Sequence, residues 1–301
     1  MNIDILSKSI GLDIGSRLTK IVGNIPERIE HELDFLIKLP PCNATDLSGS
    51  PLSTSMFRGK NFSSSIPSED SVTIYSAFST RHLSMFFCDT SDFYINKEKF
   101  LNFFFDNQIF ITGYGKNNLD FIPDSIEYTK IPELKAHFQG ALLQTGLKNF
   151  TLIDIGGQDT KVIKIRNRRM VDFVTNDKCA ASSGRFLENM SAVLKISDIG
   201  NYYKAPVELN STCAVFTESE LIGLLSEGVD RQTLAASVNY SLFRRVRKLA
   251  GKYISDDSPI VFSGGASENH AICHFFRQET TSPVYKLPFS IHNGAIGTLY
   301  M

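Results

Sequence analysis

The chain has 301 residues, and its 31 lysine and arginine residues nearly balance its 32 aspartate and glutamate residues, so the formal net charge at pH 7 is −1. At roughly 150 residues per domain, this length predicts two domains. The balanced charge argues against a large basic surface for nucleic acid or an anionic membrane. No uncharged apolar run reaches the roughly 18 residues of a transmembrane helix. We therefore expect no nucleic acid and no membrane among the partners of this protein.

The N-terminal sequence lacks a basic start followed by an apolar stretch and a small-residue cleavage site, so we expect no secretory signal and a cytoplasmic protein. An odd number of cysteines in such a chain does not predict a disulfide framework. The absence of a Cys-x-x-Cys pair excludes a zinc ribbon and a thioredoxin-like site. The cysteines are therefore small buried residues or individual ligands; they are Cys42, Cys88, Cys179, Cys213 and Cys273.

Apolar strand-like runs alternate with amphipathic helical runs, which predicts an α/β fold. Residues 9–23 read as a β-hairpin that turns at residues 15–17. Residues 151–165 repeat its pattern of apolar strand, Asp-Ile-Gly, polar turn, Thr-Lys and apolar strand, which makes Asp13 and Asp154 equivalent. This similarity indicates an internal duplication, with a first subdomain over 1–145 and a second over 146–301.

The rest of the chain divides into one irregular stretch and several helices. Residues 43–69 are rich in serine and predict a long loop or insertion, whereas the phenylalanine-rich residues 71–111 predict core elements, with an exposed partner patch as the alternative. We expect a solvated basic face on the last of the long helices, at Arg244, Arg245, Arg247 and Lys248. The expected helices cover residues 131–147, 184–195, 218–227 and 230–253.

The two hairpin turns are the first chemical signal. Successive N–H groups in a tight glycine-containing turn can hold phosphate oxygens. Asp13 and Asp154, at strand ends beside the turns, suit the water shell of Mg²⁺, and Thr19 and Lys20 add polar contacts. The sequence has no P-loop and no Gly-x-Gly-x-x-Gly motif, since Asn118 stands where the third glycine belongs after Gly113 and Gly115. The common nucleotide folds of those two types are therefore disfavoured.

A glycine pair near the C-terminus is the third part of this signal. The predicted strand before Gly264 and Gly265 is followed by a helix, and two glycines allow close approach to a flat ring or a sugar. The alternative is an ordinary strand–helix turn. A further helix is expected to start at residues 292–293, where Gly294 and Gly297 permit close packing.

Two Asp-Gly hairpins followed by a Ser-Gly-Gly turn resemble the acetate and sugar kinase, Hsp70 and actin superfamily, with its ribonuclease H-like fold. The resemblance implies two related subdomains that close on ATP, phosphate turns at residues 13–20 and 154–160, and an adenosine motif at residues 263–266. The nucleotide contacts that it implies are Gly15, Ser16, Arg17, Leu18, Thr19, Lys20, Gly156, Gly157, Asp159, Gly264, Gly265, Ala266 and Asn293.

Two cysteines lie just ahead of predicted helix N-termini. Cys179 follows Asn-Asp-Lys, and Cys213 follows Ser-Thr. A helix N-terminus favours the thiolate, and thiolates ligate iron–sulfur clusters. A 4Fe–4S cluster takes four thiolates, so two cysteines from each subunit of a symmetric dimer would complete it. The alternative is that both are buried structural residues.

The segments around these cysteines resemble the activators (archerases) of 2-hydroxyacyl-CoA dehydratases, a family that includes the ATPase subunits of benzoyl-CoA reductase. The match covers residues 9–23 and 110–299, including Asn-Asp-Lys-Cys-Ala-Ala, Ser-Thr-Cys-Ala-Val-Phe and Asp154-Ile-Gly-Gly-Gln-Asp. It implies Cys179 and Cys213 as cluster ligands. It also implies that Asp13, Asp154 and Gln158 serve catalysis, with Gln158 placing the attacking water or sensing the γ-phosphate.

The chain departs from the family pattern in three places. Ser182-Ser183 stands where the family commonly has Gly-Thr, Ala136 replaces a cysteine often seen in that helix, and residues 24–110 are longer and do not match. A rival reading places Zn²⁺ on His270, Cys273 and His274, which share one helical face. Glu218 and Glu220 complement the dipole of the helix after Cys213. The alternative is that they contact the nucleotide or the surroundings of the cluster ligands.

The resemblance implies an ATP-driven one-electron donor. Ferredoxin or flavodoxin would reduce a 4Fe–4S cluster shared by a homodimer, and ATP with Mg²⁺ would drive the electron to an iron–sulfur dehydratase or reductase. The alternatives are a small-molecule kinase with a sugar or pantothenate-like acceptor, and a redox-inactive, ATP-gated regulator.

Overall fold

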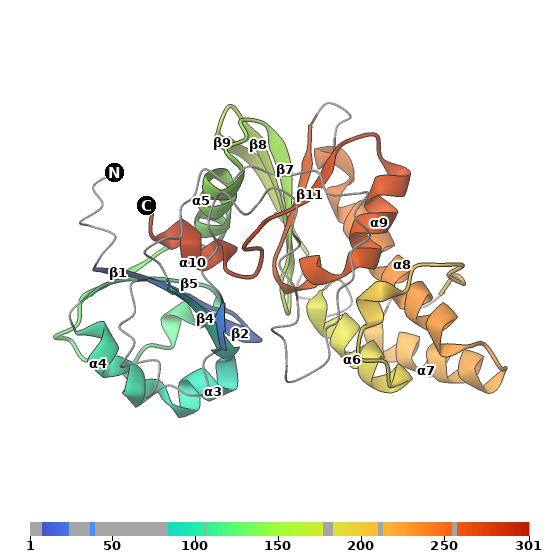
Figure 1. Ribbon diagram of the computed structural model, residues 1–301, viewed down its shortest axis with the longest axis horizontal. Helices are drawn as coiled ribbons and strands as arrows, with labels where there is room; N and C mark the ends of the chain where they lie inside the picture. Colours follow the sequence, from blue (N-terminus) through green and yellow to red (C-terminus); the bar gives the residue numbers. More distant parts are fainter. Residues whose placement is uncertain are drawn as a thin grey trace. The chain divides into compact units, whose positions relative to one another are not determined.

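The computed structural model describes residues 8–23, 37–39, 84–105, 107–176, 183–209, 213–254 and 258–300, and of residues 37–39 and 102 the backbone alone. The described residues form two compact units. The first comprises residues up to 147, except the segment 50–72, together with the C-terminal residues from 287, and the second comprises residues 148–286. Figure 1 labels the elements of both units. Among the described helices, none combines the length and the apolar character that crossing a membrane needs.

The first unit is built on a mixed six-stranded sheet in the order β3-β4-β2-β1-β5-β6. β1 is central, because it pairs antiparallel with β2 and parallel with β5. The predicted first hairpin is therefore confirmed. The strands are β1 (Ser9–Ile14), β2 (Leu18–Gly23), β3 (Ile37–Leu39), β4 (Ser84–Asp89), β5 (Gln108–Thr112) and β6 (Tyr128–Lys130).

Alternation along the strands gives this sheet two apolar faces. Ile10, Leu12 and Ile14 of β1 pack with Phe93, Phe100, Phe103 and Phe104 from α3 (Thr90–Ile95), the 3₁₀ turn Lys97–Phe100 and α4 (Leu101–Phe104). Val22 and Met85 face the other way, onto α10 (Asn293–Thr298). The phenylalanine-rich segment is thus core over the residues that the structure describes, apart from the exposed Phe105.

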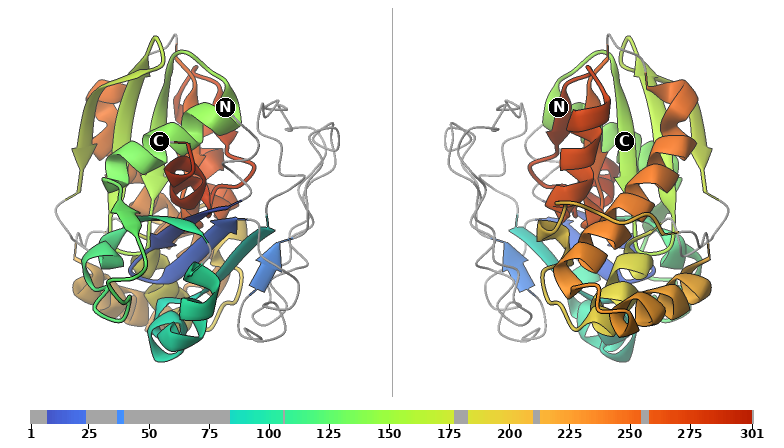
Figure 2. Two further views of the ribbon diagram at one scale, coloured as in Figure 1. Left: turned by 90° about the vertical axis from the view of Figure 1, so that its left-hand side faces the viewer. Right: turned by 90° about the vertical axis from the view of Figure 1, so that its right-hand side faces the viewer.

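α5 (Glu133–Thr145) lies directly against α10, as the left view of Figure 2 shows. Backbone meets backbone here, since a Cβ on Gly297 would collide with the carbonyl of Ala136 and one on Gly140 with that of Asn293. The side chain of Asn293 joins the helices by donating to His137 O at 2.9 Å and accepting from Gln144 Nε2 at 3.0 Å. The predicted boundary near residue 145 placed this C-terminal helix in the second subdomain; the structure packs it within the first unit.

The second unit is built on a five-stranded sheet in the order β11-β10-β7-β8-β9. β7 and β8 form the second predicted hairpin, which is confirmed, and β10 pairs parallel with β7. The strands are β7 (Phe150–Ile155), β8 (Thr160–Arg166), β9 (Arg169–Thr175), β10 (Ile260–Ser263) and β11 (Val284–Lys286).

Four helices complete the second unit, with α8 and α9 packed against the sheet (Figure 2). The Asp230 carboxylate caps α8 by accepting from Gln232 N at 2.9 Å and Thr233 N at 3.0 Å. Arg244 and Lys248 are exposed as predicted, but Arg245 stacks over the Phe186 ring at 4.7 Å. The helices are α6 (Gly184–Leu194), α7 (Ala214–Ser226), α8 (Arg231–Ala250) and α9 (His270–Glu279), with 3₁₀ turns at Tyr114–Asn117, Ile199–Asn201, Gly251–Tyr253 and Gly265–Glu268.

The contact between α5 and α10 predicts a large cost for one added methyl group. Gly297→Ala inserts a Cβ into the Ala136 carbonyl, so we expect the free energy of unfolding to fall by about 3 kcal/mol, the upper range for overpacking. Gly251→Ala is the matched control, because no atom lies within 4 Å of its added Cβ. Urea unfolding followed by circular dichroism measures both, and equal midpoints for the two variants would refute the packing argument.

Candidate functional site

The first turn is held by the start of α3. Gly15 N donates to Leu18 O at 3.1 Å, which closes the turn, and Thr90 Oγ1 donates to Gly15 O at 2.9 Å. Arg17 forms an ion pair with Asp89, at the end of β4, and its contact to nucleotide stays a prediction. Residues 15–18 are half-buried, Ser16 and Leu18 included, and Thr19 is fully buried next to Thr90.

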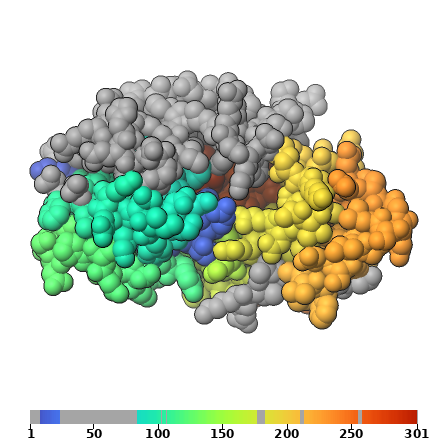
Figure 3. Space-filling model, turned by 90° about the horizontal axis from the view of Figure 1, so that it is seen from below, coloured from blue at the N-terminus to red at the C-terminus, as the bar shows by residue number. Residues whose placement is uncertain are grey.

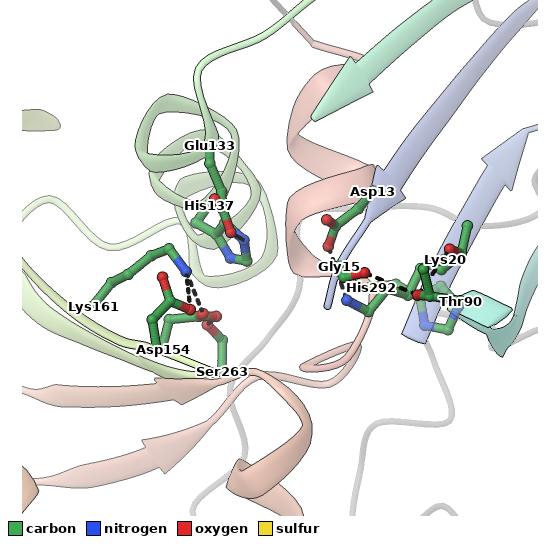
Figure 4. Close-up of polar contacts among 12 residues, drawn as sticks. Asp13, Gly15, Lys20, Thr90, Glu133, His137, Asp154, Lys161, Ser263 and His292 are labelled. Atoms are coloured by element: carbon green, nitrogen blue, oxygen red, sulfur yellow. Dashed lines mark hydrogen bonds and ion pairs between the residues drawn. The ribbon is translucent and has the colours of Figure 1, made fainter. Parts of the chain in front are cut away.

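A buried ion pair lies beside this turn. Asp13 and Lys20 are register partners across β1 and β2, and Lys20 Nζ donates to Asp13 Oδ2 at 3.2 Å (Figure 4). A buried carboxylate needs such a partner, since desolvation of a lone charge is costly. Lys20 therefore neutralises the charge of Asp13 at the edge of the turn that is predicted to bind phosphate.

The second turn repeats this geometry with one addition. Asp154 and Lys161 are register partners across β7 and β8, with 4.0 Å between Asp154 Oδ1 and Lys161 Nζ, and Lys161 also pairs with Asp159 at 2.8 Å. Ser263 Oγ donates to Asp154 (Figure 4). Gly156 N donates to Asp159 O at 2.8 Å, and Gln158 lies exposed at the tip.

The strands beyond the hairpins extend the duplication further than the sequence showed. Thr112 ends β5 opposite Asp13, and Ser263 ends β10 opposite Asp154. The next residues are Gly113 with φ 90° and Gly264 with φ 85°, each followed by a 3₁₀ turn. A Cβ on Gly264 would collide with the Ile155 carbonyl. This position therefore requires glycine both for its positive φ and for lack of space. The sequence signal was present as Thr-Gly and Ser-Gly at the ends of two predicted strands.

The predicted adenosine motif presents an open backbone. No atom lies within 4 Å of a Cβ added at Gly265, which is exposed, whereas Ala266 is buried beneath it. Ser267 Oγ donates to Gly264 O at 2.7 Å and fixes the turn. A flat ring can therefore lie on Gly265. Asn293 differs, because it is fully buried and its amide bonds the two helices of the first unit.

Cys213 is exposed and lies at the N-cap of α7, as the sequence predicts, whereas Cys179 falls outside the described residues, as does Cys42. Val215 and Phe216 follow Cys213 and are 70% and 68% exposed. α6 and α7, in yellow and orange, form part of the surface in Figure 3. The exposed thiol thus stands beside exposed apolar side chains.

The N-terminus of α6 is bonded to the second turn. Gly184 N donates to Gly156 O at 2.8 Å, and Arg185 N donates to Gly157 O at 3.0 Å. The N–H groups of Gly184 and Arg185 are therefore occupied by the turn rather than by a thiolate. The same bonds join the turn that is predicted to bind phosphate to the helix that follows a predicted cluster ligand.

The remaining cysteines and histidines of the sequence signal lie in packed environments. Burial raises the pKa of the Cys88 thiol to about 12 and that of the Cys273 thiol to about 11. A raised pKa disfavours the thiolate that Zn²⁺ needs, and the His274 ring packs on Tyr203 with 4.1 Å between centroids. Among the described residues, no group of three or more His, Cys, Asp and Glu side chains is arranged to hold a metal ion.

His292 was missed as a site residue, because only the fold brings it to the first hairpin. It is fully buried, with its Nε2 2.9 Å from Phe86 O. Burial lowers the pKa of His292 to about 4, and the neighbouring Lys20 lowers it further, against the raising effects of the Phe86 carbonyl and Asp13. The imidazole is therefore neutral at pH 7 and adds no charge beside the Asp13–Lys20 pair.

The comparisons with known proteins agree with each other. Residues 106–301 match the BadF/BadG/BcrA/BcrD ATPase family. The (R)-2-hydroxyglutaryl-CoA dehydratase activating ATPase of Acidaminococcus fermentans is 38% identical over 191 residues, 62% of this chain and 71% of that protein. The 2-hydroxyisocaproyl-CoA dehydratase activator of Clostridioides difficile is 34% identical over 202 residues, 63% of this chain and 71% of that protein.

Solved structures extend the likeness over nearly the whole chain. The activator of 2-hydroxyisocaproyl-CoA dehydratase from Clostridium difficile, with bound ADPNP, has a TM-score of 0.65 at 26% identity, covering 97% of this chain and 93% of that one. Component A of the Acidaminococcus fermentans (R)-2-hydroxyglutaryl-CoA dehydratase has a TM-score of 0.62 at 28% identity, covering 97% and 96%. The predicted fold class, two related α/β subdomains, is confirmed.

The lowered pKa of His292 predicts an acid-sensitive fold. In the unfolded chain this group takes up its proton near pH 6.5, but in the folded protein only near pH 4, so its contribution to stability is complete above pH 6.5 and is lost as the pH falls towards 4. Between pH 7 and pH 5 this amounts to about 2 kcal/mol.

Chemical unfolding at the two pH values measures this effect. In His292→Gln, which has no titrating ring, we expect the stability difference between pH 7 and pH 5 to shrink by about 2 kcal/mol. His274→Gln is the control, because His274 is half-exposed. An unchanged difference in His292→Gln would contradict the assignment.

Proposed function

The chain belongs to the BadF/BadG/BcrA/BcrD ATPase family, and from this premise we propose that it is an ATP-driven one-electron donor that activates a 2-hydroxyacyl-CoA dehydratase or a related low-potential iron–sulfur reductase. The name of the Acidaminococcus relative, a dehydratase activating ATPase, supports the activator role. We further propose that it acts in the cytoplasm as a homodimer, with ferredoxin or flavodoxin as the electron donor.

The nucleotide-binding half of the proposal rests on the two turns. N–H groups of Ser16 to Leu18 and of Gly157 to Asp159 would bind phosphate oxygens, because those of Gly15 and Gly156 close the turns, and Gly265 would take the adenine or ribose. Asp13 and Asp154 would hold Mg²⁺ through its water shell. Phosphoryl transfer to water asks mainly for positioning and charge stabilisation, and Gln158, exposed at the tip of its turn, is free to approach the γ-phosphate.

The cluster-binding half rests on the cysteines. Cys213 fits a ligand of a group shared with a second chain, because its thiol is exposed at a helix start and is bordered by the exposed side chains of Val215 and Phe216. Cys179 would supply the second thiolate of each subunit. When bound, a 4Fe–4S cluster supplies a low-potential one-electron couple whose potential responds to neighbouring N–H groups.

One observation carries the coupling between these halves. The N–H groups of Gly184 and Arg185, at the start of α6, donate to the carbonyls of Gly156 and Gly157 in the second turn. A shift of the turn on nucleotide binding or hydrolysis would therefore displace the helix that follows Cys179. A small-molecule kinase would use the same turns, but it gives no role to the exposed Cys213.

Anaerobic purification tests the proposal. We expect a brown dimer with roughly four irons, and a colourless protein without iron after Cys179→Ala or Cys213→Ala, because each substitution removes two of four thiolates. Cys88→Ala is the matched control, since Cys88 is buried in the first core and its pKa is raised. Iron content, visible absorbance and ATP-dependent reduction of an acceptor are the measurements. A colourless Cys179→Ala protein with full electron transfer would refute the proposal.

A further inference from the structure

The four residues after Gly264 form a 3₁₀ turn with one buried side and one open side. Gly265 and Glu268 begin and end this turn. Because side chains at positions i and i+3 lie above one another in a 3₁₀ helix, these two residues share one side, about 6 Å apart along the axis. Burial agrees, since Gly265 is exposed and the Glu268 side chain is 19% exposed, whereas Ala266 and Ser267 between them are buried. The Glu268 carboxylate therefore borders the open backbone of Gly265.

Lys286 holds this carboxylate from the neighbouring strand. Its Nζ donates to Glu268 Oε2 at 2.8 Å, and its side chain is 34% exposed. Lys286 ends β11, which pairs parallel with β10, the strand that leads into the turn. Ligands of open α/β sheets bind outside the carboxyl ends of the strands, so the ion pair lies at the sheet edge where a ligand is expected. Both side chains reach solvent, so a dissolved ligand can contact them.

The first unit contains the same lysine in the same place. β5 leads through Gly113 into the 3₁₀ turn Tyr114–Asn117, and Lys130, at the end of β6, donates to Asn117 Oδ1 at 3.4 Å. Lys130 pairs with the penultimate residue of β5 across two parallel strands, as Lys286 does with that of β10. The lysine and the last residue of the turn therefore belong to the duplicated part of the fold.

Two differences between the copies assign the ligand to the second one. Tyr114 stands where the second copy has Gly265, and its side chain is 72% exposed. An aromatic ring thus occupies the side of the turn that glycine leaves open. Asn117 stands where the second copy has Glu268, so the carboxylate at this position is specific to the second copy. Because a carboxylate accepts hydrogen bonds and repels phosphate, it suits the nucleoside end of a nucleotide.

We propose that the Glu268 carboxylate accepts a hydrogen bond from a neutral donor of the nucleoside of ATP, either a ribose hydroxyl or the adenine amino group, and that Lys286 is its positioning residue. A carboxylate can accept about four hydrogen bonds, so one that is paired with a lysine can still accept a bond from a ligand. Gly265 leaves room for the ring or the sugar beside it. The inference rests on the ATP-binding half of the proposed function, for which it names a selecting residue, and it is independent of the cluster.

ATP binding and hydrolysis by the full-length, anaerobically purified protein test the proposal. For Glu268→Ala we expect the KM and the Kd for ATP to rise about tenfold, as for a lost hydrogen bond to a charged group, with kcat changed less than about threefold because the bond is made equally before and during the reaction. Glu268→Gln keeps the shape with a neutral acceptor and should lie between wild type and Glu268→Ala. Lys286→Met should raise KM about threefold, and Lys286→Arg should restore it. Asn117→Ala, at the equivalent position of the first unit, is the matched control and should keep the wild-type KM.

Nucleotide analogues identify the donor. The 2′-deoxy and 3′-deoxy forms of ATP each lack one ribose hydroxyl, and inosine triphosphate lacks the amino group. The analogue without the contacted donor should bind the wild-type protein about tenfold more weakly than ATP, whereas Glu268→Ala should bind it as it binds ATP. A loss with a deoxy analogue assigns the bond to the ribose and a loss with inosine triphosphate assigns it to the base; either result supports the proposal.

The outcomes separate this inference from the proposed function. A wild-type protein that binds no ATP would overturn the proposed function itself. Wild-type affinity for ATP in Glu268→Ala, or the same discrimination among the analogues in both proteins, would overturn the role of Glu268 and leave the family's ATPase activity intact. A rise in KM that accompanies a loss of folded structure in both Glu268→Ala and Glu268→Gln, measured by circular dichroism, would also overturn it.

Discussion

A lysine paired with a buried aspartate across the first two strands of each hairpin is the interaction on which the rest of the structure depends. Asp13 with Lys20 and Asp154 with Lys161 place one charge pair at the carboxyl end of a central, otherwise apolar strand. Removal of one partner would leave an uncompensated buried charge, which is among the most destabilising changes known. Each pair therefore fixes the register of its hairpin. That register in turn sets the direction in which the turn presents its N–H groups.

The hairpins, most helices and the fold class were predictable because they are local. Strand alternation and turn residues fixed β1–β2 and β7–β8, and caps such as Asp230 marked the start of a helix. The ion pair between Arg17 and Asp89 joins residues 72 positions apart, and α10 crosses back to the first unit. Such contacts depend on tertiary packing, which residue spacing alone does not contain. Residue spacing therefore did not show that Arg17 pairs with Asp89 or that Asn293 joins two helices, and their contacts to nucleotide stay predictions.

The candidate site was predictable in its duplicated parts and not in its unique ones. Asp13 and Asp154 were found because each copy supports the other, and Gly264 because a strand precedes it. His292 has no counterpart pattern; it meets the first hairpin only because the chain that leads into α10 packs beside it. The duplication therefore predicted the parts that the two copies share. It did not predict that Ser263 donates to Asp154 whereas Thr112 donates to Ile131 O.

The link between the second turn and α6 is made by main-chain atoms alone. These hydrogen bonds depend little on which side chains are present, since every residue except proline has a backbone N–H donor. Substitutions nearby, such as the serine pair before Gly184, therefore leave the donors of Gly184 and Arg185 in place. The second turn and the start of α6 can therefore stay joined while the side chains around them change.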